Sequence, residues 1–224
     1  RLVVGGFEKV FELNKNFRNE GISHKHNPEF TMLELYQAYA DYNDMMALFE
    51  DLVSSLAQKI LGTTKVSFQD KEIDLTPPYR RITLMDSIKE HTGIDFMEIK
   101  TDDDALKAAG HCGIELEIEI NTKWKILDEI FSKKVEPNLI QPTFIIDYPV
   151  AISPLAKQKE GNPDFVERFE PFIGGVEVGN AFSELNDPQE QRRRFEEQRK
   201  DDKKAIDEEY VFALEPGMPP AGGL

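Results

Sequence analysis

Apolar and polar residues alternate in two stretches near the amino terminus. The first covers residues 10–13 (Val-Phe-Glu-Leu), and the second runs from Phe30 to Tyr36. A period of about two is typical of β-strands. Residues 19–28, between them, are polar and include glycine, asparagine and proline, which favour a loop. We therefore predict a long antiparallel hairpin, preceded by a strand-like run at Leu2-Val3-Val4.

From residue 41 to residue 62 the apolar spacing becomes that of an α-helix. An aspartate or asparagine at position 41, 43 or 44 can cap its start, and Gly62 ends it. Its apolar face consists of Met45, Leu48, Phe49, Leu52, Leu56 and Ile60. Beyond it we predict a small hairpin over residues 64–75 and a short helix that Thr83 opens and Gly93 stops.

The segment from about residue 95 to residue 135 has no clear strand pattern. Asp102-Asp103-Asp104 caps a predicted helix through Ala109, and a second predicted helix runs from Trp124 to Val135. We interpret this segment as a helical insertion (95–135) within one domain that spans residues 1–224. Its charge runs, which include Lys133-Lys134, are expected to lie on solvated faces, and Cys112 is expected to be a buried or inert thiol.

Strand patterns return after residue 141. Gly174-Gly175 separates two apolar stretches and is a strong signal for a hairpin turn. Asp187 followed by Pro188 is typical of a helix start. The elements predicted here are strands over residues 142–148, 165–172 and 176–182 and helices over residues 187–204 and 207–214. We predict no closing element at Gly222-Gly223-Leu224. The predicted fold class is α+β, an antiparallel β-sheet flanked by helices.

Charge and composition exclude several classes of protein. The formal net charge of −15 argues against broad electrostatic capture of nucleic acid, although it leaves a local contact open. Arg192–Arg194 is interpreted as a solvated helix face, with a nucleic-acid contact as the alternative. The single cysteine excludes an internal disulfide and fits a reducing cytosol. No apolar run reaches membrane-spanning length.

Candidate chemistry gathers on the first hairpin. Phe30, Glu34 and Tyr36 differ by even numbers, so their side chains share one face of the predicted sheet. An aromatic ring, a carboxylate and a phenol suit a binding surface better than a core. Arg18, at the shoulder of the hairpin, can bind a phosphate or a carboxylate.

The second hairpin carries carboxylates. Glu170 and Glu177 stand on opposite arms of its turn, where they repel unless a cation lies between them. Such oxygen ligands suit Mg²⁺, especially when phosphates complete its shell; two exposed glutamates beside a turn are the plainer interpretation. Asn180, Phe182 and Glu184 again alternate onto one face. Together the hairpins favour a nucleoside triphosphate site built on strands, since the sequence lacks the P-loop and GxGxxG patterns.

These residues resemble motif 2 of the class II aminoacyl-tRNA synthetases. In that motif a strand ends in F-R-x-E, a loop follows, and a second strand returns. Here the pattern is Phe17-Arg18-Asn19-Glu20, a loop through His26-Asn27-Pro28, and Glu29-Phe30-Thr31. Four further stretches resemble the lysyl-tRNA synthetases: residues 32–36 (MLELY), 38–42 (AYADY), 153–157 (SPLAK) and 180–187 (NAFSELND). The resemblance spans nearly the whole chain, including the helical insertion.

The resemblance implies roles for the matching residues. Arg18 would bind the α-phosphate of ATP and the lysine carboxylate. The rest of the implied ATP site is Glu20 and Asn27 at the adenine, His26 at the outer phosphates and Phe30 stacked under the adenine. Glu170 and Glu177 would hold Mg²⁺, and the implied lysine pocket consists of Glu34, Tyr36, Asn180, Phe182 and Glu184. The chemistry of lysine supports this pocket independently, because each ammonium group needs a counter-charge when it is buried.

The implied function is ATP-dependent activation of L-lysine and its transfer to tRNA(Lys) by a cytoplasmic homodimer. Motif 1, motif 3 and an anticodon-binding domain would lie outside the chain. We therefore interpret both ends as cuts and expect the chain alone to be weakly active or inactive. Two alternatives stay open: a paralogue that attaches a lysine-like amino acid to elongation factor P, and a non-catalytic regulator that binds lysine or a nucleotide. The regulator is disfavoured because binding alone needs no metal pair, and the chain retains Arg18, Glu20, Glu170 and Glu177 together.

Overall fold

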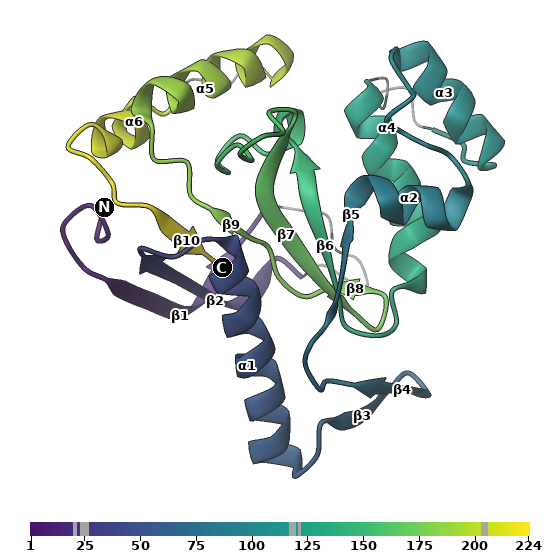
Figure 1. The fold of residues 1–224 in the computed structure, drawn as a ribbon, viewed down its shortest axis with the longest axis horizontal. Helices are drawn as coiled ribbons and strands as arrows, with labels where there is room; N and C mark the ends of the chain where they lie inside the picture. Colours follow the sequence, from purple (N-terminus) through teal and green to yellow (C-terminus); the bar gives the residue numbers. More distant parts are fainter. Residues whose placement is uncertain (20–21, 23–26, 117–119, 121, 203–205) are drawn as a thin grey trace.

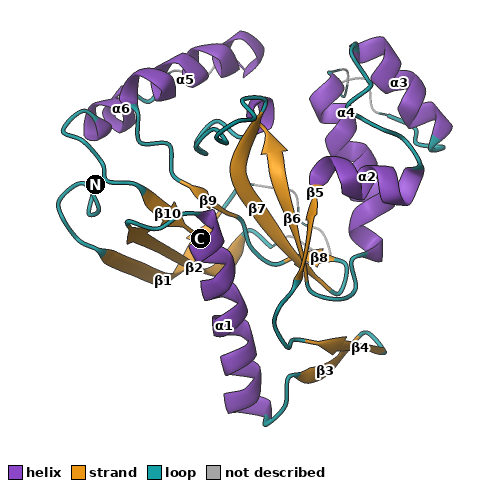
Figure 2. Ribbon diagram, viewed as in Figure 1, coloured by secondary structure: helices purple, strands orange, loops and turns teal. Residues whose placement is uncertain are grey.

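A mixed β-sheet forms the centre of the molecule (Figures 1 and 2). The structure is a computed structural model of the 224-residue chain, and it describes residues 1–19, 22, 27–116, 120, 122–202 and 206–224. The strand order in this sheet is β1-β2-β10-β9-β7-β6-β5, with β8 paired to β7. The bounds of these strands are β1 Lys9–Phe17, β2 Glu29–Ala38, β5 Arg80–Thr83, β6 Thr143–Pro149, β7 Phe165–Ile173, β8 Val176–Glu177, β9 Ala181–Ser183 and β10 Ala221–Gly223. The predicted antiparallel sheet is confirmed, and β5–β6 adds one parallel pair at its edge.

The amino-terminal hairpin forms as the alternating pattern predicts, with Glu12 on β1 opposite Glu34 on β2. The chain before it differs from the prediction, because the run Leu2–Val4 lies in a turn rather than a strand. The N–H of Gly6 donates to the carbonyl of Val3, and Gly6 has a φ of 95°. Glycine adopts this φ without the strain that a Cβ atom would cause, so the chain can reverse just before β1.

Strand β10 corrects the prediction that residues 222–224 form no closing element. It pairs antiparallel with β2 on one side and with β9 on the other. Leu224 continues the ladder through two backbone hydrogen bonds to Leu35, with N–O distances of 2.8 and 2.9 Å. β10 therefore joins the amino-terminal hairpin and the strands that follow residue 141 into one sheet (Figure 1).

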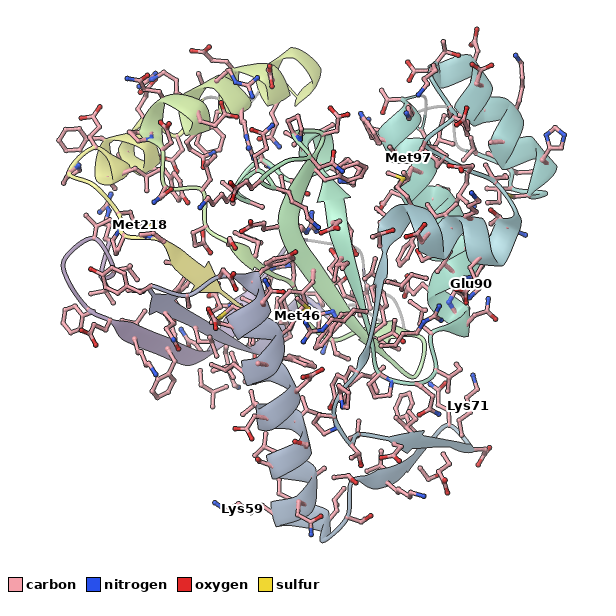
Figure 3. All side chains as sticks on the ribbon, in the orientation of Figure 1. Met46, Lys59, Lys71, Glu90, Met97 and Met218 are labelled. Atoms are coloured by element: carbon pink, nitrogen blue, oxygen red, sulfur yellow. The ribbon has the colours of Figure 1, made fainter. Side chains whose placement is uncertain are left out.

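Helix α1 (Tyr42–Leu61) packs on one face of this sheet (Figure 1). The carboxylate of Asp41 accepts from the N–H groups of Asn43 and Asp44, and the N–H of Asp41 donates to Asp44, which completes a capping box. Gly62 ends the helix in the left-handed conformation, as predicted. The core between α1 and the sheet contains Met45, Met46, Phe49, Phe144, Phe169 and Ala181. Met46 lies in this core, whereas Lys59 extends from the far end of the helix (Figure 3).

The segment predicted as a helical insertion packs beside β5 and β6 (Figure 1). Its elements, with the helix before it, are α2 Leu84–Thr92, α3 Asp102–His111, α4 Lys123–Ile130 and a π-helical turn Phe131–Val135. Two details differ from the prediction. Thr101 rather than an aspartate caps α3, because its hydroxyl accepts from the N–H of Asp104, and the predicted helix over 124–135 divides into α4 and the π-helical turn. Its status as an inserted unit stays a prediction.

The remaining elements agree with the predicted positions. They are the hairpin β3 Lys65–Phe68 and β4 Lys71–Asp74, and the helices α5 Pro188–Asp202 and α6 Glu208–Leu214. Asp187 caps α5 by accepting from the N–H groups of Gln189 and Glu190. Within the described ranges, none of the helices combines the length and apolar character that crossing a membrane requires.

Candidate active site

The face of the sheet opposite α1 carries the predicted residues of the first hairpin. Leu35 packs into the core beneath α1, so its neighbours Glu34 and Tyr36 point to the other face. Arg18 lies at the far end of the same face, where its guanidinium carbon is 5.3 Å from the centre of the Phe30 ring. This contact places the guanidinium beside the strand that carries Glu34 and Tyr36.

Gly223 brings the two predicted halves of the site together. On β10 it lies opposite Tyr36 of β2 on one side and opposite Phe182 of β9 on the other. A Cβ atom at this position would overlap Oε1 of Glu184 and would lie 2.8 Å from the Tyr36 ring. Glycine at 223 therefore leaves room for Glu184 and Tyr36 to meet above β10.

Glu184 is a buried carboxylate without a cation. It is 7% exposed, and among the described residues it takes part in no ion pair. Burial raises the pKa of Glu184 to about 8. Burial and the charges of Glu184 and Glu34 raise the pKa of Tyr36 to about 12. The pair therefore offers a ligand a neutral phenol and a carboxyl group that ionises when a cation reaches it, an arrangement that suits an ammonium group.

A cavity of about 480 Å³ opens beside Glu34, Tyr36 and Glu184. Its other wall comes from α6 and includes Asp207, Glu209 and Tyr210, which the sequence did not single out. Burial and the charge of Glu184 raise the pKa of Tyr210 to about 12. Met218, between α6 and β10, also lines the cavity (Figure 3). The sequence predicted only a short helix over residues 207–214, so this wall of the cavity depends on tertiary packing.

A register shift between β6 and β7 directs Tyr148 toward Glu170 of the second hairpin. The pairing moves from Ile146↔Phe169 to Tyr148↔Val166, so Asp147 alone, with a φ of 60°, stands opposite two residues of β7. The shift places Tyr148 on the same face as Ile145 rather than on the opposite one. Its hydroxyl then donates to Oε2 of Glu170 at 2.6 Å, deep in the structure. Strict alternation along the strand would have turned Tyr148 away from Glu170.

A second irregularity aligns Glu177 with Phe182. The predicted strand over 176–182 divides into β8 and β9, because the pairing with β7 moves by one residue between Phe172↔Glu177 and Phe169↔Ala181. Residues directly opposite each other in an antiparallel pair share a face. Glu177 and Phe182 therefore lie on the same face of the sheet although one number is odd and the other even.

The two predicted metal ligands are electrostatically linked. Partial loss of solvent and the negative charge of Glu170 raise the pKa of Glu177, although Glu177 still reaches the surface. Within the described ranges, no group of three or more His, Cys, Asp or Glu side chains is arranged to hold a metal. The oxygen donors of two carboxylates nevertheless fit a Mg²⁺ ion whose remaining ligands are phosphates or water.

The structure connects the predicted residues as two groups on one face. Glu34, Tyr36 and Glu184 share the cavity, and Asn180 joins Glu170 through Arg168. Phe182 packs partly against the core beside the insertion. Asn27 is exposed at the edge of the hairpin loop, and the predicted ATP residues Glu20 and His26 lie outside the described residues.

One prediction about the basic run on α5 is wrong. Arg194 is 2% exposed and donates to the backbone carbonyls of Ser153 and Ala156 rather than facing solvent. Arg192 and Arg193 do lie near the surface, where they pair with glutamates. Arg194 is buried because it anchors the loop over residues 153–156, and its backbone contacts replace hydration. Cys112 is half-buried, and burial raises its pKa, which agrees with an inert thiol.

Comparison with known proteins identifies close relatives of this chain. The family model described as tRNA synthetases class II (D, K and N) matches residues 1–224. The chain is 58% identical to the lysine–tRNA ligases of Pelotomaculum thermopropionicum and Moorella thermoacetica, and 55% identical to that of Clostridium acetobutylicum. Each match includes 100% of this chain and 46%, 47% and 45% of the respective relative. The chain thus spans about half the length of the curated relatives it matches.

Proposed function

Because this chain belongs to the class II tRNA synthetases of the D, K and N group, we propose that it supplies the catalytic core of a lysine–tRNA ligase. Its substrates are L-lysine, ATP and tRNA(Lys). In the whole protein this core acts as part of a homodimer in the cytoplasm. The paralogue that modifies elongation factor P is not favoured, because the relatives described above are lysine–tRNA ligases.

The observation that carries the proposal is the buried, unpaired carboxylate of Glu184. A buried carboxylate is costly unless a cation reaches it, and a pocket that requires a cation rejects neutral isosteres. The side-chain ammonium of lysine supplies this cation, with the phenol of Tyr36 as a second, neutral partner. Glu34, on the same cavity, contributes further negative charge for either ammonium group.

The ATP half of the proposed site lies on the first hairpin. Arg18 binds the α-phosphate and the lysine carboxylate, and Phe30 supplies an aromatic surface for the adenine. Glu20, His26 and Asn27 are proposed to contact the adenine and the outer phosphates, on the family resemblance alone. The contact between Arg18 and Phe30 supports the proposal that the phosphate and the base are recognised side by side on this strand pair.

The proposed magnesium ligands are Glu170 and Glu177. When bound there, Mg²⁺ neutralises phosphate charge and polarises the phosphoryl oxygens. Neighbouring side chains orient the two carboxylates. An ion held by these two carboxylates would have further coordination positions for phosphate oxygens and water.

The proposed reaction has two steps. A carboxylate oxygen of lysine attacks the α-phosphorus of ATP, the bond to the bridging oxygen breaks, and pyrophosphate leaves. A terminal ribose hydroxyl of tRNA then attacks the carbonyl of lysyl-adenylate, and AMP leaves. In the first step, Arg18 holds both reactants in line and offsets negative charge on the phosphate.

The test is Glu184→Gln in the full-length protein. Loss of the counter-charge should weaken lysine binding by about 100-fold, equivalent to roughly 3 kcal/mol, while ATP binding is retained. Glu209→Gln is the matched control, because Glu209 lines the same cavity but is exposed and paired with Arg1. Lysine-dependent ATP–pyrophosphate exchange and calorimetric binding give the two readouts. Absence of lysine-dependent exchange in the wild-type protein, or equal loss of ATP and lysine binding in Glu184→Gln, contradicts the proposal.

A further inference from the structure

Arg168, on β7, lies between the residues proposed to bind magnesium and those proposed to bind lysine. We infer that Arg168 is a positioning residue that fixes Glu170 and Asn180 at the same time and thereby links the metal site to the amino-acid site. This inference rests on the proposed function, because the proposed function assigns the roles of Glu170 and Asn180.

The guanidinium group of Arg168 donates to acceptors in three parts of the fold. Nη2 donates to Oε1 of Glu170 at 2.5 Å, and Nε donates to Oδ1 of Asn180 at 3.0 Å. Nη1 donates to the carbonyl oxygen of Ile152 and to the hydroxyl of Ser153, both at 2.9 Å. An arginine has five N–H donors in a rigid plane, so these bonds fix the positions of all four acceptors relative to one another.

Tyr148 completes the arrangement around Glu170. The centre of its ring lies 4.5 Å from the guanidinium carbon of Arg168, and its hydroxyl donates to Oε2 of Glu170 at 2.6 Å. Each oxygen of Glu170 therefore has one fixed donor, and the second lone pair of each oxygen remains for a cation. This is the arrangement of a metal ligand whose orientation is set by its neighbours.

The contact with Arg168 also determines the orientation of the Asn180 amide. An arginine side chain only donates, so the amide oxygen must face Nε of Arg168 and the amide NH₂ must face away from it. Asn180 therefore presents donors to the site. Such donors suit a carboxylate or phosphate oxygen of the substrates rather than an ammonium group. Within the lysine pocket, Asn180 is therefore expected to face a substrate oxygen.

Arg194 provides a matched control for the structural part of this arrangement. It holds the same loop, through the carbonyls of Ser153 and Ala156, and its hydrogen bonds reach neither Glu170 nor Asn180. If Arg168 served only to anchor this loop, replacing either arginine would have the same consequences. If Arg168 positions the two site residues, only its replacement should weaken binding.

The experiment compares Arg168→Lys with Arg194→Lys in the full-length protein. Lysine keeps the positive charge but replaces the planar fork with a single ammonium, which cannot hold four separated acceptors. Mn²⁺ binding is measured by electron paramagnetic resonance in the presence of ATP, and L-lysine binding by calorimetry without metal. We expect Arg168→Lys to weaken both by about tenfold, as loss of a partner that orients a ligand does. Arg194→Lys should lower the melting temperature and change both affinities by less than about twofold.

Two further variants keep the test independent of folding defects. Asn180→Asp, at an exposed position, keeps an acceptor for Arg168 but removes the amide donors, so it should weaken lysine binding and retain Mn²⁺ binding. Arg168→Lys combined with Asn180→Ala should lose no more lysine affinity than the more damaging single change. Additive losses, equal losses in both arginine variants, or unchanged Mn²⁺ binding in Arg168→Lys would overturn the inference. A wild-type protein that binds no lysine fails the proposed function instead, while the Mn²⁺ comparison still decides the role of Arg168 at Glu170.

Discussion

Gly223 lies so close to Glu184 that a single added carbon atom would overlap the carboxylate. The backbone of β10 is thus the floor on which Glu184 and Tyr36 meet, although residue 184 belongs to a different part of the chain from residue 36. The atoms that would have to move are the end of a flexible side chain and an aromatic ring rather than backbone. A change at position 223 should therefore disturb the pocket without preventing folding.

Gly223→Ala is the first prediction. The new methyl group should displace Glu184 and Tyr36, and lysine affinity should fall by about 10- to 100-fold, since displacements of about 1 Å have such effects. ATP binding should be unchanged, as measured by calorimetry. Gly110→Ala, in α3, is the control, because a Cβ atom there meets nothing within 4 Å. Unchanged lysine affinity in Gly223→Ala would show that the pocket lies elsewhere.

The pH dependence of lysine binding is the second prediction. Burial raises the pKa of Glu184 to about 8, so the free carboxyl group is mostly protonated below that pH. An ammonium ligand requires the ionised form, and the proton must leave on binding. Lysine affinity should therefore rise about tenfold per pH unit between pH 6 and pH 8 and level off above pH 8. Calorimetry in buffers of different ionisation enthalpy should detect one released proton, and Glu184→Gln should show neither effect.

The cavity wall on α6 gives the third prediction. Tyr210→Ala should admit water to Glu184, return its pKa toward the ordinary value and shift the pH profile of lysine binding to lower pH. Phe212→Ala is the matched control on the same helix, because Phe212 is 70% exposed and does not line the cavity. Identical pH profiles for Tyr210→Ala and the wild-type protein would contradict a role of Tyr210 in shielding Glu184.

Local sequence signals were sufficient for helices and for the long hairpin. The helix start and the turn at Gly62 depend on neighbours within a few residues; Gly62 was predicted to the residue, and the cap, narrowed to residue 41, 43 or 44, is Asp41. β10 was not predictable in this way, because Ala221–Gly223 has no alternating pattern and pairs only with strands distant in sequence.

Alternation along a strand also does not always predict which face of the sheet a single residue occupies. Alternation correctly placed Glu34 and Tyr36 on one face, because β1 and β2 pair without interruption. It could not place Tyr148, whose face depends on the left-handed conformation of Asp147 and on the register shift against β7. Backbone irregularities of this kind are set by tertiary packing and often lie beside functional sites.

The cost of the buried charge is the final prediction. Because the pKa of Glu184 in the folded protein lies well above that of an exposed glutamate, about 4.5, ionisation of this group destabilises the fold as the pH rises from about 4.5 to about 8. Glu184→Gln removes this cost, so the variant should unfold at a higher temperature than the wild-type protein above pH 8 and should gain little at pH 5. Urea unfolding should give nearly equal free energies of unfolding at pH 5 and a difference of up to several kcal/mol above pH 8, at about 1.4 kcal/mol per pKa unit. Saturating lysine should remove the difference by stabilising only the wild-type protein, because the ligand supplies the missing counter-charge. Equal stability of the two proteins across this pH range would mean that Glu184 is hydrated or paired in solution.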